Sequence, residues 1–385
     1  MPTTQDYIDS IFSEIIVAAS REDLRSVLKT CPPPASVRDE TYRRLKIIKP
    51  HGGPALRLST GGFVARQVVG DELLVIVSTE QLNADERNAL DGLMVHEGGE
   101  PDALDIASFC NLAFHAGEIY RIKTELRSQE AAEDQIDLTT IEGGYKGHEL
   151  ATVMSWFEDV SVYKFERTSR LFDARSSLIA ALLGGSISAF RSPLMDSTLA
   201  SKVLSLVNLP NVNPENVYLA LTSQHWKHAF IEIYRLVEAL YYLPWVLDLR
   251  AANKSTQSGL LMARQCRSFL DWREREESSI RKLFGLLPDT SVVRADLIST
   301  SPFSGIAPDE INSGSVAERI YKIRNQLIHQ EDYEERSRLT INDDFWPVSL
   351  DFLIDISTIL YATYAADAAY VFSLSSPSIL AAEAA

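Results

Sequence analysis

Apolar residues recur at helical spacing along most of the chain. In the first predicted helix, residues 5–30, these positions are Ile8, Ile11, Phe12, Ile15, Ile16 and Leu24. The run CPPP at residues 31–34 should end this helix, because proline lacks an N–H and restricts the residue before it. Helical spacing returns at residues 84–94 and 102–126, and again in two or three segments between residues 148 and 207.

One stretch near the N-terminus has a different pattern. Residues 55–79 contain runs of β-branched and aliphatic residues, broken at Gly61-Gly62 and at Gly70-Asp71. Glycine pairs and Gly-Asp between such runs are typical of hairpin turns. The pattern therefore predicts a small antiparallel sheet inside an α+β N-terminal region, residues 1–126.

The rest of the chain is predicted to be helical. Residues 127–210 form a helical linker or middle region, which opens with the polar, acidic stretch Arg127–Asp137. Proline and asparagine concentrate at residues 208–216, where we place the main domain boundary. Beyond it, residues 211–385 predict a bundle of four long helices, at about residues 217–250, 260–287, 315–333 and 345–372. The predicted fold class is mainly α, with a C-terminal four-helix bundle preceded by the smaller α+β region.

Charge limits the possible partners. The chain has 385 residues, and 37 Lys+Arg against 53 Asp+Glu give a net charge of −16. This opposes a protein that coats nucleic acid or anionic lipid, so any contact with nucleic acid must be local.

The location is predicted from cysteine usage and apolar runs. Three cysteines, with no close pair, exclude a disulfide framework or a CxxC site and suit a reducing cytoplasm. The N-terminus lacks the charged and apolar parts of a secretory signal. The longest apolar runs, residues 177–190 and 236–249, are shorter than the roughly 20 residues that span a bilayer. We expect a cytoplasmic protein with no membrane contact.

The third predicted bundle helix contains a polar set among apolar positions. Ile320, Ile323, Leu327 and Ile328 have the spacing of a buried face. Arg324, Asn325 and His329 interrupt it. Asn325 and His329 are four residues apart and so share one face of a helix, and the long side chain of Arg324 can swing toward the same space.

These residues resemble the signature of the HEPN superfamily of helical-bundle ribonucleases and nucleotide-binding proteins. Its signature is an Arg, usually followed by a polar residue, with a His four to six residues after the Arg; here it is Arg324-Asn325-Gln326-Leu327-Ile328-His329 within IYKIRNQLIH. The resemblance covers residues 217–372. It includes the upstream helix FIEIYRLVEALYYL, where members often carry an acidic residue; Glu238 is the candidate.

The residue types suit metal-independent cleavage of RNA. His329 can act as acid or base near neutral pH, Arg324 can stabilise charge on the phosphate, and Asn325 can orient His329 or bind the phosphate. Arg319 and Lys322 would widen the phosphate-binding strip. The resemblance implies an endoribonuclease that acts as a toxin or antiviral effector, leaves 2′,3′-cyclic phosphate ends and dimerises so that two motifs line one cleft. It leaves room for a regulatory or antitoxin partner and requires no cofactor.

Two other interpretations stay open. The bundle can be a non-catalytic module that binds nucleotide, RNA or protein, or a plain scaffold in which Arg324 pairs with Glu331 or another nearby carboxylate and His329 caps the helix. Metal sites are not predicted: His148-Glu149 lacks the second histidine of HExxH, and His225 and His228 lack two further ligands.

Overall fold

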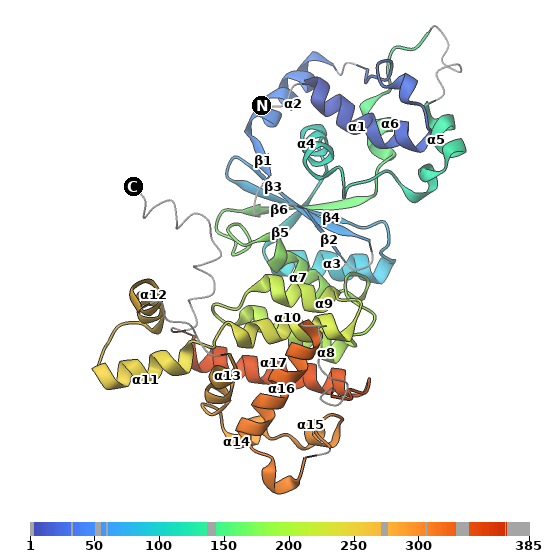
Figure 1. Cartoon of the computed structure of the whole chain (residues 1–385). Coiled ribbons are helices and arrows are strands. Elements are labelled where there is room, and N and C mark those ends of the chain that lie inside the picture. Colours follow the sequence, from blue (N-terminus) through green and yellow to red (C-terminus); the bar gives the residue numbers. More distant parts are fainter. Residues whose placement is uncertain are drawn as a thin grey trace. The chain divides into compact units, whose positions relative to one another are not determined.

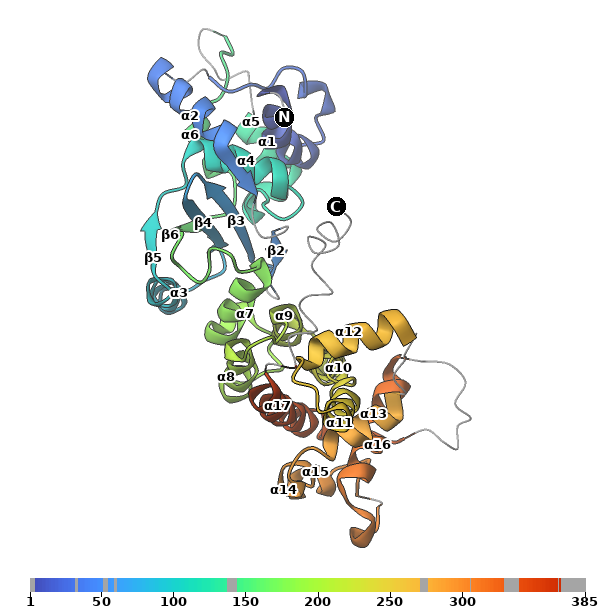
Figure 2. The same ribbon diagram turned by 90° about the vertical axis from the view of Figure 1, so that its left-hand side faces the viewer.

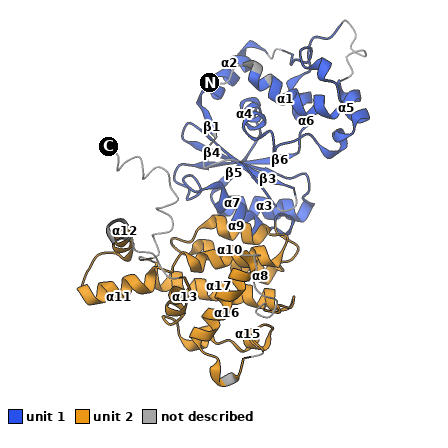
Figure 3. Ribbon diagram, viewed as in Figure 1, with its two compact units in different colours: residues 1–190 blue, residues 191–385 orange. Residues whose placement is uncertain are grey.

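The computed structural model describes residues 4–31, 34–50, 55–58, 61–136, 144–270, 276–304, 306–328, 339–365 and 367. The chain divides into two compact units, unit 1 (residues 1–190) and unit 2 (residues 191–385), which Figure 3 shows in different colours. The division follows Phe190, whereas the sequence predicts it at residues 208–216. Residues 127–190, predicted as a linker or middle region, thus belong to unit 1.

Unit 1 contains an antiparallel sheet. Its strands are β1 (Ile48–Pro50), β2 (Leu56–Arg57), β3 (Phe63–Val69), β4 (Glu72–Ser78), β5 (Gly99–Asp102) and β6 (Val160–Glu166). The order is β1-β3-β4-β6-β5, with β2 also paired to β3. The predicted hairpin is confirmed: β3 and β4 pair from Val64↔Val77 to Val69↔Glu72, and Gly70 in the turn has a φ of 66°, which glycine adopts readily.

Strand β6 explains why unit 1 extends beyond residue 126. It lies between β4 and β5, with Leu73 opposite Phe165 on one side and Gly99 opposite Phe165 on the other. Gly99 is needed here because an added Cβ would lie 2.5 Å from the Phe165 ring. The sequence pattern misses both strands. Strand β6 lies within residues 148–207, where only helical segments are predicted, and β5 lies where the helical segments predicted at residues 84–94 and 102–126 adjoin.

Helices cover both faces of this sheet (Figure 1). They are α1 (Thr4–Ala18), α2 (Ala35–Ile47), α3 (Ala84–His96), α4 (Ile106–Ala116), α5 (Gln129–Ile136), α6 (Leu150–Ser155) and α7 (Ser176–Ser186). Helices α1 and α4 pack together on one side, and α7 lies against β3 with α3 beside it on the other. The predicted apolar face of the first helix is buried at Ile11, Phe12, Ile15 and Ile16. The helix ends at Ala18, however, and not near residue 30.

The described residues of unit 2 form helices and no strand. The helices are α8 (Ser197–Ser205), α9 (Pro214–Thr222), α10 (Trp226–Glu238), α11 (Leu243–Asn253), α12 (Gly259–Leu270), α13 (Glu276–Phe284), α14 (Asp289–Val292), α15 (Ala295–Ser299), α16 (Ser313–Ile328) and α17 (Phe345–Tyr364). Helix α10 packs against α9 and α17, and α13 against α16, as Figure 2 shows for α10 beside α17. Fully buried aromatic side chains, including Phe230 and Phe345, fill the core between them.

Two of the four predicted long helices are interrupted. The segment 217–250 divides into α9, α10 and α11, because the chain turns at Ser223 and again before Pro244, which stands in the first turn of α11 where proline is tolerated. The segment 260–287 contains α12 and α13, and the residues between them lie outside the described part. Helix α16 matches the third prediction up to Ile328. Helix α17 matches the fourth up to Tyr364.

Helix α17 is a 20-residue apolar helix, longer than either of the apolar runs noted in the sequence. Among the described residues it is the one helix with the length and composition to cross a membrane, and 61% of its apolar window is buried inside the protein. Its buried positions include Leu350, Leu353, Ile356 and Leu360. Such burial is typical of a core helix, and α17 packs against α10.

Candidate active site on helix α16

The arginine of the motif lies at the inner face of α16. Val316, Ala317, Ile320 and Ile323 of this helix are fully buried and fix its orientation in unit 2. Arg324 follows Ile323 directly, and its side chain is only 11% exposed. A buried guanidinium needs partners, because an unpaired charge away from water costs several kcal/mol.

Carboxylates from two other helices supply those partners. Nη2 of Arg324 donates to Oε1 of Glu238, the last residue of α10. Nη1 donates to Oδ1 of Asn325, 2.9 Å away, and lies 3.5 Å from Oε2 of Glu276, the first residue of α13. The structure therefore places Glu238, 86 residues upstream, on the motif arginine, where the resemblance suggested an acidic residue.

The surroundings keep Arg324 charged. Burial alone lowers its pKa, but the negative charges of Glu238 and Glu276 outweigh burial, so the pKa is raised. The guanidinium also lies 6.0 Å from the ring centre of Tyr234, within the range of a cation–π contact. Tyr234 shares a hydrogen bond with Tyr241, and burial raises the pKa of both hydroxyls.

Glu276 is the partner that the sequence did not reveal. Its side chain is 47% exposed, more than the 30% of Glu238, and it also accepts a hydrogen bond of 3.3 Å from the hydroxyl of Tyr321. No spacing rule links residue 276 to residue 324, because α13 and α16 meet only through tertiary packing. The longer distance and greater exposure make Glu276 the more easily displaced of the two carboxylates.

Lys322 does not extend this arrangement. Lys322 is two residues from Arg324, about 200° around the helix, and its ammonium pairs with Glu318 at 2.6 Å. Glu318 also pairs with Arg281 of α13. Nε of Arg319 is buried without a hydrogen-bond partner among the described residues. Lys322 therefore lies on a different side of α16 from Arg324 and is neutralised by Glu318. The predicted phosphate-binding role of Arg319 stays a prediction.

His329 lies outside the described residues, as does Glu331. The end of α16 is nevertheless well anchored, because the amide of Gln326 makes two hydrogen bonds with the backbone of Leu339, donating to its carbonyl at 3.1 Å and accepting from its N–H at 3.0 Å. The chain thus returns to the motif helix directly after the segment that carries His329. Asn325 is partly buried, and its oxygen faces Arg324.

Elsewhere the histidines considered above do not converge with carboxylates. His225 and His228 have ring centres 5.6 Å apart, and both are exposed. Within the described residues no group of three or more His, Cys, Asp or Glu side chains is placed to hold a metal ion.

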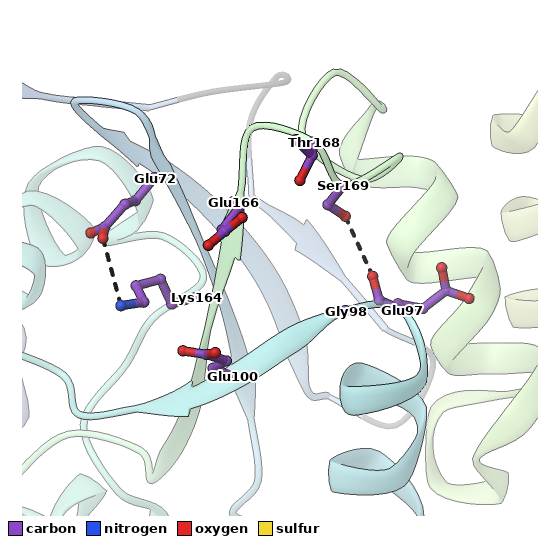
Figure 4. A pocket seen from close by; sticks show the side chains of 8 residues that line it. All are labelled: Glu72, Glu97, Gly98, Glu100, Lys164, Glu166, Thr168 and Ser169. Carbon is purple, nitrogen blue, oxygen red and sulfur yellow. Dashed lines mark hydrogen bonds and ion pairs between the residues drawn. The ribbon is translucent and has the colours of Figure 1, made fainter.

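Unit 1 has a small pocket lined mainly by carboxylates. Its volume is about 210 Å³, and Figure 4 shows its lining: Glu72, Glu97, Gly98, Glu100, Lys164, Glu166, Thr168 and Ser169. Lys164 lies 3.6 Å from Glu72, and Glu97 is held by Arg170 at 2.5 Å. The lining carries more carboxylates than cations, so the pocket repels phosphate groups and does not suit an RNA site.

Comparisons with protein-family models, with curated proteins and with solved structures find no match to this chain. The arrangement of Glu238, Glu276, Arg324 and Asn325 is therefore the main evidence on function.

Proposed function

We propose that the chain is a metal-independent endoribonuclease of the HEPN type, which acts as a toxin or antiviral effector in the cytoplasm. Unit 2 would be a HEPN-like four-helix bundle and the source of the active site. The observation that carries the proposal is the ion pair between Arg324 and Glu238. It joins the motif helix to the upstream helix that the resemblance singles out, and these two residues are far apart in sequence.

The proposed reaction uses groups of the motif. His329 takes the proton from a ribose 2′-hydroxyl, whose oxygen attacks the adjacent phosphorus. The bond from phosphorus to the 5′-oxygen breaks, the 5′-oxygen takes up a proton, and a 2′,3′-cyclic phosphate and a 5′-hydroxyl result. Arg324 and Asn325 donate to the phosphate oxygens as negative charge develops. Since one histidine is half of an acid–base pair, a second copy of the chain supplies the other half across a two-fold axis.

The neighbours of Arg324 give it a defined way to bind phosphate. Glu238 holds one edge of the guanidinium, so the side chain stays in place. A phosphate oxygen would then take the position of Glu276 at Nη1, exchanging one anion for another. This exchange exposes no bare charge, which keeps its cost low.

The same contacts favour one alternative, a non-catalytic HEPN-like module that dimerises or binds nucleotide, RNA or protein. Arg324 is 11% exposed and already has two carboxylate partners. Two carboxylate partners within the same unit also suit an arginine that only holds the helices in register.

Digestion of RNA in the presence of EDTA separates the two functions. Wild-type protein should yield 2′,3′-cyclic phosphate ends, and Arg324→Ala and His329→Ala should each lose cleavage by about 10³-fold. Arg235→Ala and His228→Ala are matched controls, because Arg235 forms an ordinary ion pair with Glu232 and His228 is exposed. Intact RNA across many substrates would instead support the binding module. Undiminished cleavage by either motif variant would contradict the proposed site.

A further inference from the structure

Helix α2 of unit 1 is a basic helix in an acidic protein. Of its residues and those of β1, five are cations and two are anions: Arg38, Arg43, Arg44, Lys46 and Lys49 against Asp39 and Glu40. The whole chain, by contrast, carries −16. A local excess of cations in a chain of this charge marks a place where an anionic partner is attracted and the rest of the surface repels it.

This helix is also unusually exposed. None of its residues is buried, and residues 34–40 are all exposed. Its contacts with the rest of unit 1 come from its C-terminal half: Arg44 pairs with Asp105 at 3.0 Å, and Leu45 packs partly against the core. Helix α2 buries little apolar surface, so its exposed face is available for a partner.

One side of α2 has the composition of a nucleic-acid contact. At 100° per residue, Arg38, Tyr42 and Lys46 follow one another within about 80° of arc, and Arg43 lies about 60° beyond Lys46. One anion, Asp39, falls between Lys46 and Arg43, so this side of α2 carries three cations and one anion. We call Arg38, Tyr42, Arg43 and Lys46 the basic face. All four side chains are exposed, and Tyr42 retains 43% of its surface. The ion pairs here are weak ones: Arg38 lies 3.7 Å from its neighbour Asp39, Arg43 pairs with Glu40 one turn away, and Lys46 pairs with no described residue.

We propose that the basic face of α2 binds the backbone and bases of single-stranded RNA. The cations contact successive phosphates along about 12 Å of helix, and Tyr42 between them offers a ring on which a base stacks. The inference deepens the proposed function, because it gives unit 1 the task of holding the RNA that unit 2 cleaves. Its binding readout does not depend on cleavage.

A membrane surface is a poorer partner for helix α2 than RNA. Membrane-surface helices need a continuous apolar stripe opposite their basic face. Among the exposed apolar residues of α2, Tyr42 lies on the basic face itself, and Val37 and Ile47 lie about 80° apart on the other side of the helix. The charged residues Glu40 and Arg44 stand between Val37 and Ile47, so the two form no continuous stripe.

The test uses a labelled single-stranded RNA of about 16 nucleotides and the full chain carrying His329→Ala, so that the RNA stays intact. Anisotropy titrations compare the triple variant R38Q/R43Q/K46Q with a matched control, R21Q/R25Q/R167Q, which removes three exposed cations from the same unit. Glutamine keeps the helix propensity of lysine and arginine. We expect the first variant to lose at least about tenfold in affinity and to reduce the salt slope by about 2, and the control to lose less than about twofold.

Tyr42→Ala tests stacking separately. It should weaken binding about tenfold with an unchanged salt slope, and Tyr42→Phe should restore it. Equal losses in the two triple variants would overturn the proposal, because they would show a general effect of charge. So would binding to vesicles rich in phosphatidylserine or to a polyglutamate peptide in place of RNA.

The two proposals can fail separately. If wild-type protein cleaves RNA and both triple variants bind RNA equally well, the proposed RNA-binding role of the basic face is wrong, and the proposed ribonuclease activity is supported. If the basic face binds RNA as expected while wild-type protein leaves RNA intact, the RNA-binding role of the basic face is supported, and the proposed ribonuclease activity is wrong.

Discussion

Each unit buries one arginine in a different way. Arg66 of β3 is 3% exposed and donates three hydrogen bonds to the backbone carbonyls of Leu171, Phe172 and Ala174. Arg324 of unit 2 contacts the carboxylates of Glu238 and Glu276. Carbonyl oxygens are neutral and fixed to the chain, whereas a mobile carboxylate can be replaced by another anion. Arg66 is therefore locked into the fold, and Arg324 is able to change partners.

The two environments affect the pKa of each arginine in opposite directions. Burial lowers the pKa of Arg66 to about 10, although Asp173 opposes the effect. The pKa of Arg324 is raised, because its carboxylates outweigh burial. Both arginines are charged near neutral pH, so the two sites differ in the kind of partner, neutral carbonyls for Arg66 and carboxylates for Arg324.

The largest expected effect is on stability and comes from Arg66→Met. The variant leaves three carbonyls without their donor and should lose about 3–5 kcal/mol of the free energy of unfolding. Hydrogen exchange of the β3 and β4 amides measures this loss within unit 1. Arg57→Met, an exposed arginine of the same sheet, should lose at most about 1 kcal/mol. Equal losses would show that Arg66 is not a special anchor.

A buried carboxylate of unit 1 gives the next effect. Burial, aided by Glu80 and opposed by Arg127, raises the pKa of Glu158 to about 7, and its side chain is 8% exposed. The folded state then holds this proton more tightly than the unfolded state. The contribution of Glu158 to the free energy of unfolding is therefore largest below about pH 4.5. It declines as the pH rises toward 7, by up to about 3 kcal/mol.

Glu158→Gln should remove that decline. The difference between the urea unfolding curves of wild type and variant, taken from pH 5 to 8, isolates the contribution of this residue. Glu72→Gln, whose side chain is 46% exposed, should leave the pH dependence as in wild type. A Glu158→Gln profile parallel to that of wild type would contradict the raised pKa.

A double-mutant cycle tests whether Arg324 and Glu238 depend on each other. Arg324→Gln leaves Glu238 unpaired and should lose about 1–3 kcal/mol, whereas the double variant with Glu238→Gln should recover part of that loss. Cleavage of RNA should stay lost in both. Recovery of cleavage in the double variant would show that the guanidinium is not needed for the reaction, and the scaffold interpretation would then be favoured.

The smallest effect is expected from Glu276→Gln. Removing the competing carboxylate should raise the affinity for single-stranded RNA by about 3–10-fold, measured with His329→Ala in both proteins. The control is Glu277→Gln, the next residue on α13, which pairs with Arg281 and is 54% exposed. The same gain from both substitutions would mean a general effect of charge and would leave Glu276 without a role at Arg324.

Some of this architecture follows from local sequence. Gly70-Asp71 between two β-branched runs predicts the β3–β4 hairpin. The apolar spacing of Ile320, Ile323, Leu327 and Ile328 predicts α16 as a helix with one buried face; Ile320 and Ile323 are fully buried, whereas Ile328 is 45% exposed. The predicted helix 217–250 contains residues that break helices, at Ser223-Gln224 and Pro244. The continuous apolar spacing of this segment nevertheless favoured a single helix. Strand β6 was missed because its seven residues stand between two helical segments and its pairing partners are distant.

The sequence by itself determined which segments turn, which helical faces are apolar, and that Arg324 and Asn325 stand side by side, because these depend on neighbours within a few residues. Only the tertiary structure decided that Glu238 and Glu276 meet Arg324, that Glu318 neutralises Lys322, and that β6 joins unit 1. Such contacts depend on how whole helices and strands pack, and packing sums many weak interactions that no local spacing records.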